Sequence, residues 1–216
     1  MYGFVRASIG IIVFACCVII IKKFNPSKKK RWYTISLVIV CAFSSLMFLF
    51  PFENIFMTFS SPKKAFQYMN SSEIKDIITG SDSSFIISTK NEAYVYNILP
   101  KSDNGWKISS NSETKMISQI ICESGVICVY RYKKSVDYYL VIVNRTSDKL
   151  IVSDNRNSPV YSMEKYNNIL SEPHYTYYVC AQNIDDEYII NINNESIHVN
   201  IINQGINQGI NQGTVL

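Results

Sequence analysis

Acidic residues are absent from the first 52 positions of this 216-residue sequence. The same stretch holds seven of the 21 basic residues, and all 17 acidic residues follow it. The formal net charge of +4 and the pI of 8.6 therefore come from one short basic segment. A chain that is basic only there lacks the broad positive surface of nucleic-acid-binding proteins, so we expect no nucleic-acid partner.

Residue types and motifs that carry catalysis are also scarce. His174 and His198 are the two histidines, and the sequence has no G-x-S-x-G motif and no glycine-rich phosphate loop. A C-x5-C spacing with one histidine is a weak metal-binding pattern. The acidic run 185–187 is typical of a solvated turn between strands. We therefore expect neither enzymatic activity nor a metal or cofactor.

Two long uncharged segments occupy the N-terminal part. The first, ASIGIIVFACCVIII, reaches about the length of a membrane span if it extends to 4–21 with Arg6 at the headgroups. The second, WYTISLVIVCAFSSLMFLFPF, covers 32–52 and would span about 31 Å as a helix. Trp32 and Tyr33 suit a membrane interface, and Pro51 marks the other end. We predict two transmembrane helices, over about 4–21 and 32–52. The alternatives are buried helices of a soluble protein and, for the first segment, a cleaved signal peptide.

The basic segment lies between these two predicted spans, in the loop 22–31. Short loops rich in lysine and arginine stay on the cytoplasmic side, so the N-terminus and residues 53–216 should lie outside a plasma membrane. Arg6 is a single opposing charge on the outer side. The loop can also contact anionic lipid headgroups. Its basic residues are Lys22, Lys23, Lys28, Lys29, Lys30 and Arg31.

The sequence beyond the spans predicts a juxtamembrane segment, a short helix and then strands. Residues 53–60 contain several apolar side chains and are expected to lie in the membrane interface. Ser61 and Pro62 form a typical helix start, and this helix should end near Asn70.

About eleven strand-like segments follow, rich in Ile, Val and Tyr and separated by turn residues. Short connections favour antiparallel pairing, so we predict an all-β extracytoplasmic domain over 61–201 that begins with the short helix. An antiparallel meander of this kind can form a sandwich, a barrel or a small propeller. The threefold repeat INQG predicts a flexible tail over 202–216. The strand-like segments are 73–79, 84–89, 93–99, 106–110, 115–122, 126–132, 137–143, 150–154, 175–181, 187–192 and 196–201.

Two tyrosine pairs are candidate binding aromatics. Tyr130 and Tyr132 lie two positions apart on one strand, as do Tyr175 and Tyr177 on another, so each pair shares a strand face. Such a strip could bind a glycan or a peptide, whereas the alternative is ordinary packing on a sheet.

Cys122 and Cys128 are candidates for a disulfide in the outer part of the chain. A three-residue hairpin loop over 124–126 would place them opposite each other, whereas a two-residue loop would not. The alternative is that they remain buried thiols.

The motifs SPKKAFQYM and PKSDNGW, together with SDSSFII and SDNRNS, resemble those of small uncharacterised two-span membrane-anchored proteins of Gram-positive bacteria. In those proteins an S-P-x-x-A-F helix precedes a β-rich outer domain that contains a D-N-G-W turn. The resemblance covers roughly 61–188 and implies a bacterial plasma membrane. It implies no activity, and it assigns no catalytic residue.

These observations together predict a membrane-anchored extracytoplasmic binding or interaction module. Its expected partners are membrane lipid and another protein or an envelope polymer. An alternative is an accessory subunit that acts through its transmembrane hairpin within a membrane complex, and an envelope enzyme is a further alternative.

Overall fold

A computed structural model describes residues 2–24, 29–49, 51–109, 113–133, 135–166 and 173–201. The chain divides into two compact units, Met1–Thr114 (unit 1) and Lys115–Leu216 (unit 2). Two β-containing units therefore stand where the sequence predicts one β domain over 61–201.

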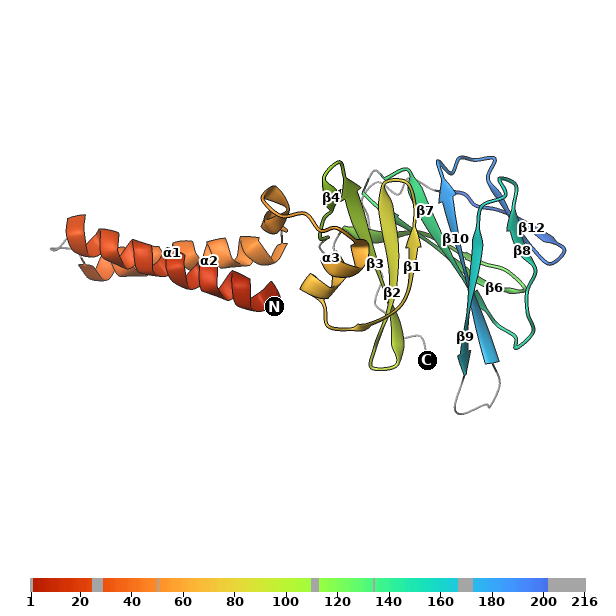
Figure 1. The fold of residues 1–216 in the computed structure, drawn as a ribbon, viewed down its shortest axis with the longest axis horizontal. Helices are drawn as coiled ribbons and strands as arrows, with labels where there is room; N and C mark the ends of the chain where they lie inside the picture. Colours follow the sequence, from red (N-terminus) through yellow and green to blue (C-terminus); the bar gives the residue numbers. More distant parts are fainter. Residues whose placement is uncertain are drawn as a thin grey trace. The chain divides into compact units, whose positions relative to one another are not determined.

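Unit 1 begins with two helices, α1 (Tyr2–Phe24) and α2 (Lys29–Leu49), which lie side by side (Figure 1). Both helices were predicted. In α1, the 18-residue window Phe4–Ile21 is long and apolar enough to cross a membrane. In α2, the described apolar stretch is Tyr33–Phe43, which is shorter than a span requires. The described residues thus support one candidate span, and the second stays a prediction.

The connection between the two helices is shorter than the predicted loop 22–31. Because α1 continues to Phe24 and α2 begins at Lys29, only 25–28 separates them, and this stretch lies outside the described residues. Lysine and arginine are good helix formers, so the basic residues at each end continue the helices instead of ending them.

The segment after α2 forms a single 3₁₀ turn, η2 (Phe52–Ile55), and then the helix α3 (Pro62–Met69). Ser61 caps α3, since its hydroxyl accepts the Lys64 N–H at 3.3 Å. The predicted start and end of this helix are confirmed.

The sheet of unit 1 is an antiparallel meander with strand order β1-β2-β3-β4. Its strands are β1 (Glu73–Thr79), β2 (Ser83–Lys90), β3 (Ala93–Ser102) and β4 (Gly105–Trp106). Helix α3 packs on one face of this sheet, where Ala65 and Phe66 share a buried cluster with Ile86, Leu99 and Trp106.

The DNGW motif makes the turn between β3 and β4 that the sequence predicts. Ser102 pairs with Gly105 across the turn, and the next residue, Trp106, is buried in the core of unit 1. Trp106 also exchanges two backbone hydrogen bonds of 2.8 Å with Phe59. The predicted strand 106–110 is much shorter, because the backbone of Ile108 bonds to the side chain of Asn54 instead of to a strand.

Unit 2 contains two sheets, of which the first is five-stranded with order β5-β6-β7-β10-β9. The second is three-stranded with order β12-β11-β8. The strands are β5 (Thr114–Ile121), β6 (Gly125–Tyr132), β7 (Asp137–Asn144), β8 (Val152–Asp154), β9 (Val160–Tyr166), β10 (Pro173–Gln182), β11 (Ile189–Ile192) and β12 (Glu195–His198). Strand β9 was not predicted.

The core of unit 2 lies between its two sheets, so this unit is a β-sandwich. Alternate residues of the longer sheet, such as Val129 and Leu140, belong to the same buried cluster as Ile190 and Ile192 of the shorter sheet. The sandwich is one of the three architectures that the sequence left open. The predicted tail 202–216 lies outside the described residues.

Candidate functional site

The base of the helical pair carries a buried ion pair in unit 1. Arg6 Nε and one terminal nitrogen each donate to a different carboxylate oxygen of Glu53, both at 2.9 Å. The side chains of Arg6 and Glu53 are only 4% and 1% exposed. A two-pronged contact of this kind fixes orientation as well as distance, so it ties the start of α1 to the turn that follows α2.

Aromatic side chains surround this ion pair. The Arg6 guanidinium lies 5.3 Å from the centroid of the Phe52 ring. Tyr68 of α3 responds to the same charges: burial raises its pKa, the Glu53 carboxylate raises it further, and Arg6 acts to lower it. Sequence reasoning missed this cluster, because it expected Arg6 to reach toward lipid headgroups. The signal that could have found it is that Glu53 is the first acidic residue in the chain.

The segment after Glu53 is held to the stretch that follows β4 by specific bonds. The Asn54 side chain donates to the Ile108 carbonyl at 2.8 Å and accepts the Ile108 N–H at 2.9 Å. Phe59, which the sequence placed in the membrane interface, packs instead against the core of unit 1. The predicted interfacial segment 53–60 is thus partly folded into this unit, whereas Ile55 and Phe56 remain exposed.

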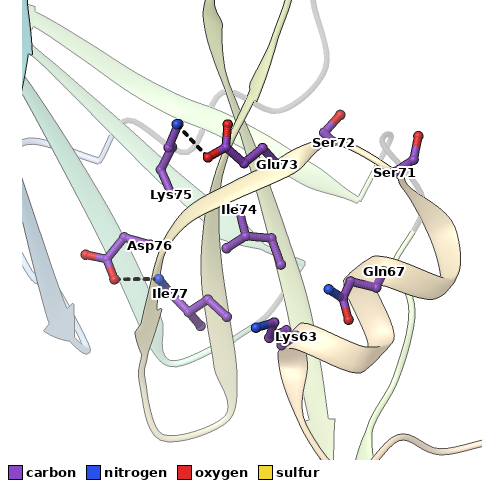
Figure 2. Close-up of a pocket in the computed structure, with 9 residues that line it drawn as sticks. All are labelled: Lys63, Gln67, Ser71, Ser72, Glu73, Ile74, Lys75, Asp76 and Ile77. Carbon is purple, nitrogen blue, oxygen red and sulfur yellow. Dashed lines mark hydrogen bonds and ion pairs between the residues drawn. The ribbon is translucent and has the colours of Figure 1, made fainter.

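An open groove of about 620 Å³ lies between α3 and the edge strand β1 (Figure 2). Ile74 and Ile77 form its floor and pack against the core, while Lys63 and Gln67 line it from the helix. The arrangement offers both charges and a partly apolar floor, which suits an extended polar segment of a protein or polymer.

The edge strand beside this groove carries its own protection. The register with β2 shifts between Ile74 and Asp76, and the Asp76 carboxylate accepts the backbone N–H of Ile77 at 2.8 Å. Glu73 and Lys75 form an exposed ion pair on the same strand (Figure 2). A bulge and charged side chains of this kind block uncontrolled strand addition, so a ligand of this groove must bring side-chain contacts of its own.

The tyrosine pairs of unit 2 do not form one binding strip. The pairing of Tyr177 with Ile142, and of Tyr130 with Tyr139, places the two tyrosine pairs on opposite faces of the five-stranded sheet. Tyr177 is buried, and its hydroxyl accepts the N–H of Leu150 at 2.7 Å. Its predicted role in ligand binding is therefore corrected to a role in the core.

The other three tyrosines are half-buried. Tyr175 packs against the core of unit 2, and the Lys149 ammonium lies 5.4 Å from its ring centroid. The Lys133 ammonium lies 5.3 Å from the centroid of Tyr132. Tyr130 and Tyr132 keep an accessible part, so they remain candidates for weak contacts with a partner.

The candidate disulfide between Cys122 and Cys128 is not formed in this structure. The hairpin between β5 and β6 has a two-residue turn, in which Cys122 exchanges two backbone hydrogen bonds with Gly125. Cys122 therefore lies opposite Gly125 and not Cys128, and both cysteines are free thiols. Burial raises the pKa of Cys128, so this thiol is also a poor nucleophile at neutral pH.

Asp154 and Tyr188 form a buried polar contact in unit 2 that the sequence did not predict. The Tyr188 hydroxyl donates to one Asp154 oxygen at 2.7 Å, and the backbone N–H groups of Arg156 and Ser158 donate to the other. Burial acts to raise the pKa of Asp154, but hydrogen bonds, chiefly from Ser158 and Tyr188, outweigh it and lower the pKa. Burial and the bond to Asp154 raise the pKa of Tyr188 far above its usual value.

Arg156 extends this contact to the acidic run 185–187. Its guanidinium donates to Asp185 at 2.6 Å and to the carbonyl oxygens of Gln182 and Asn183. The acidic run thus acts in part as a partner for Arg156, and not only as the solvated turn that the sequence predicts. These bonds hold two loops of the sandwich together, which is a structural role.

The basic residues proposed for lipid contact sit at the adjoining ends of the two helices. Lys22 and Lys23 belong to the last turn of α1, and Lys29, Lys30 and Arg31 belong to the first turn of α2. Lys28 lies outside the described residues.

Metal-ligating side chains do not gather in groups of three or more within the part of the chain that the structure describes. Comparisons with protein-family models, with curated proteins and with solved structures found no match.

Proposed function

We propose that this protein is a membrane-anchored extracytoplasmic interaction module. In this proposal α1 and α2 both span a plasma membrane, and the two β-containing units lie outside. The proposal agrees with the resemblance of the SPKKAFQYM and DNGW motifs to two-span anchored proteins of Gram-positive bacteria.

The observation that carries the proposal is the inverted burial of the two helices. Polar side chains, Arg6 and Ser36, are buried in unit 1, while large apolar side chains of both helices face outward. Such a large exposed apolar surface is rare on a soluble protein and is what lipid-facing helices present. The exposed apolar residues include Ile11, Ile12, Ile19 and Ile20 of α1, and Leu37, Val38 and Ile39 of α2.

Two serines support the same interpretation. The hydroxyl of Ser8 donates to the Phe4 carbonyl, and that of Ser45 donates to the Cys41 carbonyl, both at 2.9 Å. A serine that bonds to its own helix needs no water, so it can lie in hydrocarbon at little cost.

The ion pair at the base of the helices is compatible with the proposed orientation. The six basic residues of 22–31 favour the cytoplasmic side, and Arg6 was the one basic residue that opposed this. In the folded chain the Arg6 guanidinium is paired with the Glu53 carboxylate, so this one residue is accommodated on the proposed outer side.

The orientation can be tested by labelling single cysteines in intact cells. The background variant replaces all six cysteines by serine, and Ser27→Cys or Asp186→Cys is then added. An impermeant maleimide should label Asp186→Cys directly and Ser27→Cys only after permeabilisation. The opposite pattern would overturn the orientation, and direct labelling of both would overturn the hairpin.

The groove between α3 and β1 is the surface that we propose for the partner, which is an extended segment of a protein or an envelope polymer. A photo-crosslinking residue at Gln67, inside the groove, should capture this partner in living cells. The matched control is the same residue at Gln182, which is exposed in unit 2. Asp76→Lys should weaken capture at Gln67, and equal capture at both positions would contradict the proposal.

A further inference from the structure

Ile55 and Phe56 are the exposed large apolar side chains of unit 1 outside its two long helices, among the residues that the structure describes. Ile55 is 86% exposed and Phe56 is 63% exposed. They are neighbours in sequence, and they belong to the turn that directly follows α2. Two such side chains together form a patch, which is more informative than a single exposed residue.

The exposure of this patch does not come from a loose segment. The N–H groups of Phe56 and Met57 both bond to the Glu53 carbonyl, at 3.1 and 2.8 Å. Glu53 itself is held by Arg6, and Asn54 is held by the backbone of Ile108. The backbone on either side of Ile55 is thus fixed, and the fold holds these apolar side chains outward.

A chain of contacts connects the patch to Arg6, near the N-terminal end of the apolar window of α1. The Phe56 ring lies 5.9 Å from the Phe52 ring, which in turn lies 5.3 Å from the Arg6 guanidinium. Arg6 is two residues from Phe4, where the apolar window Phe4–Ile21 begins. Two residues of helix rise only about 3 Å, so the patch connects through Phe52 to a residue close to the N-terminal end of this window.

We propose that Phe4, Ile55 and Phe56 form an apolar collar that inserts into the outer boundary of the membrane, between acyl chains and headgroups. The partner of this surface is the lipid itself. This inference rests on the proposed function, in which α1 and α2 span the bilayer. The collar would hold the sheet of unit 1 at a set height above the lipid.

A polar groove beside the collar is consistent with this depth. It has a volume of about 380 Å³ and is lined by residues 54–58 together with Asp103, Asn104 and Lys107. Aliphatic and aromatic side chains next to polar and charged ones match the boundary between acyl chains and headgroups. The collar and the groove together thus form an amphipathic surface.

The inference can be tested by lipid quenching of tryptophan fluorescence in nanodiscs. The full chain with Trp32→Phe serves as the background, and Ile11→Trp, Ile55→Trp or Ile151→Trp is added. This background keeps the buried Trp106 of unit 1, so its fluorescence and quenching are measured alone and subtracted. Ile151 is the matched control, because it is an isoleucine in unit 2 that is 76% exposed. Lipids brominated near the headgroup end of the acyl chain, or near its methyl end, report the depth of each tryptophan.

We expect Ile55→Trp to be quenched several-fold more by the shallow bromine than by the deep one, and Ile151→Trp to be quenched by neither. Ile11→Trp should be quenched by the deep bromine. If Ile11→Trp behaves as expected while Ile55→Trp matches Ile151→Trp, the collar is refuted and the anchored module stands. If Ile11→Trp is not quenched, the proposed function itself fails.

Discussion

At the scale of single residues, Arg6 and Glu53 connect parts of unit 1 that are 47 positions apart in sequence. Neither residue is stable in the interior alone, because removing a charge from water costs several kcal/mol unless a partner compensates it. The buried Glu53 carboxylate is therefore stable only while α1 supplies Arg6. The buried Arg6 guanidinium is in turn stable only while the turn after α2 supplies Glu53.

Replacing Glu53 by alanine should lower the free energy of unfolding by about 3–5 kcal/mol, because the Arg6 charge stays buried without its carboxylate. The measurement is a urea titration of the full chain in detergent micelles. Glu73→Ala is the matched control, since the Glu73–Lys75 pair is exposed. This control should change the free energy by less than about 1 kcal/mol. Equal effects of the two substitutions would refute the role given to the buried pair.

Asp154 should make unit 2 sensitive to acid. Its folded pKa is lowered below the unfolded value of about 3.9, so its stabilising effect is complete above that value and is lost as the pH falls through the folded pKa. Asp154→Asn should lower stability at neutral pH by about 1–3 kcal/mol and flatten the acid dependence. Hydrogen exchange of peptides from β8 and β11 measures both effects. An unchanged acid dependence in the variant would contradict this assignment.

Tyr188 should limit the same unit at alkaline pH. Because its folded pKa is raised, its contribution is complete below the unfolded pKa of about 10 and is lost as the pH rises above it. Tyr188→Phe cannot ionise, so the variant should lose about 1–2 kcal/mol at neutral pH but show a weaker alkaline decline. The same exchange experiment at rising pH checks this, and a steeper decline in the variant would be the contrary result.

At the scale of elements, the hairpin between β2 and β3 contains a residue poorly suited to its backbone. The two-residue turn is Asn91 and Glu92, with φ angles of 50° and 65°. Asparagine tolerates this left-handed region, whereas glutamate does not.

Glu92→Gly should therefore raise the free energy of unfolding by about 1 kcal/mol, because glycine adopts this backbone without a steric penalty. The control is Glu123→Gly in the two-residue turn between β5 and β6, where neither central residue has a positive φ. That change should be neutral or destabilising. Thermal unfolding of both variants measures these changes in stability. Stabilisation by Glu123→Gly alone would contradict the strain assigned to Glu92.

The elements also show which features a sequence can predict. The bounds of α3 follow from Ser61, Pro62 and Asn70, because helix caps are local signals. Strands β1 to β3 were also predicted, because their composition and the turn residues between them are local signals too. Strand β9 was missed because its apolar and polar residues alternate weakly, although it pairs with the next strand of the chain, β10. The contacts of Arg6 and Asp154 join distant parts of the chain, so local patterns carry no sign of them.

At the scale of the whole molecule, the buried pair bears on the processing of the N-terminus. A signal peptide cleaved after α1 would remove Arg6 and leave the Glu53 carboxylate buried without its guanidinium. We therefore expect the protein extracted from membranes to retain α1. Intact mass spectrometry of the purified chain measures this, and a mass that corresponds to loss of the first helix would refute it.

The same ion pair has a consequence for the order of synthesis. Arg6 emerges from the ribosome long before Glu53, so an inserting α1 at first carries a guanidinium with no carboxylate to meet it. The pair can close only after α2 and the following turn have been made. If α1 and α2 insert as proposed, closure of the pair would follow the synthesis of α2 and would hold the hairpin in one topology.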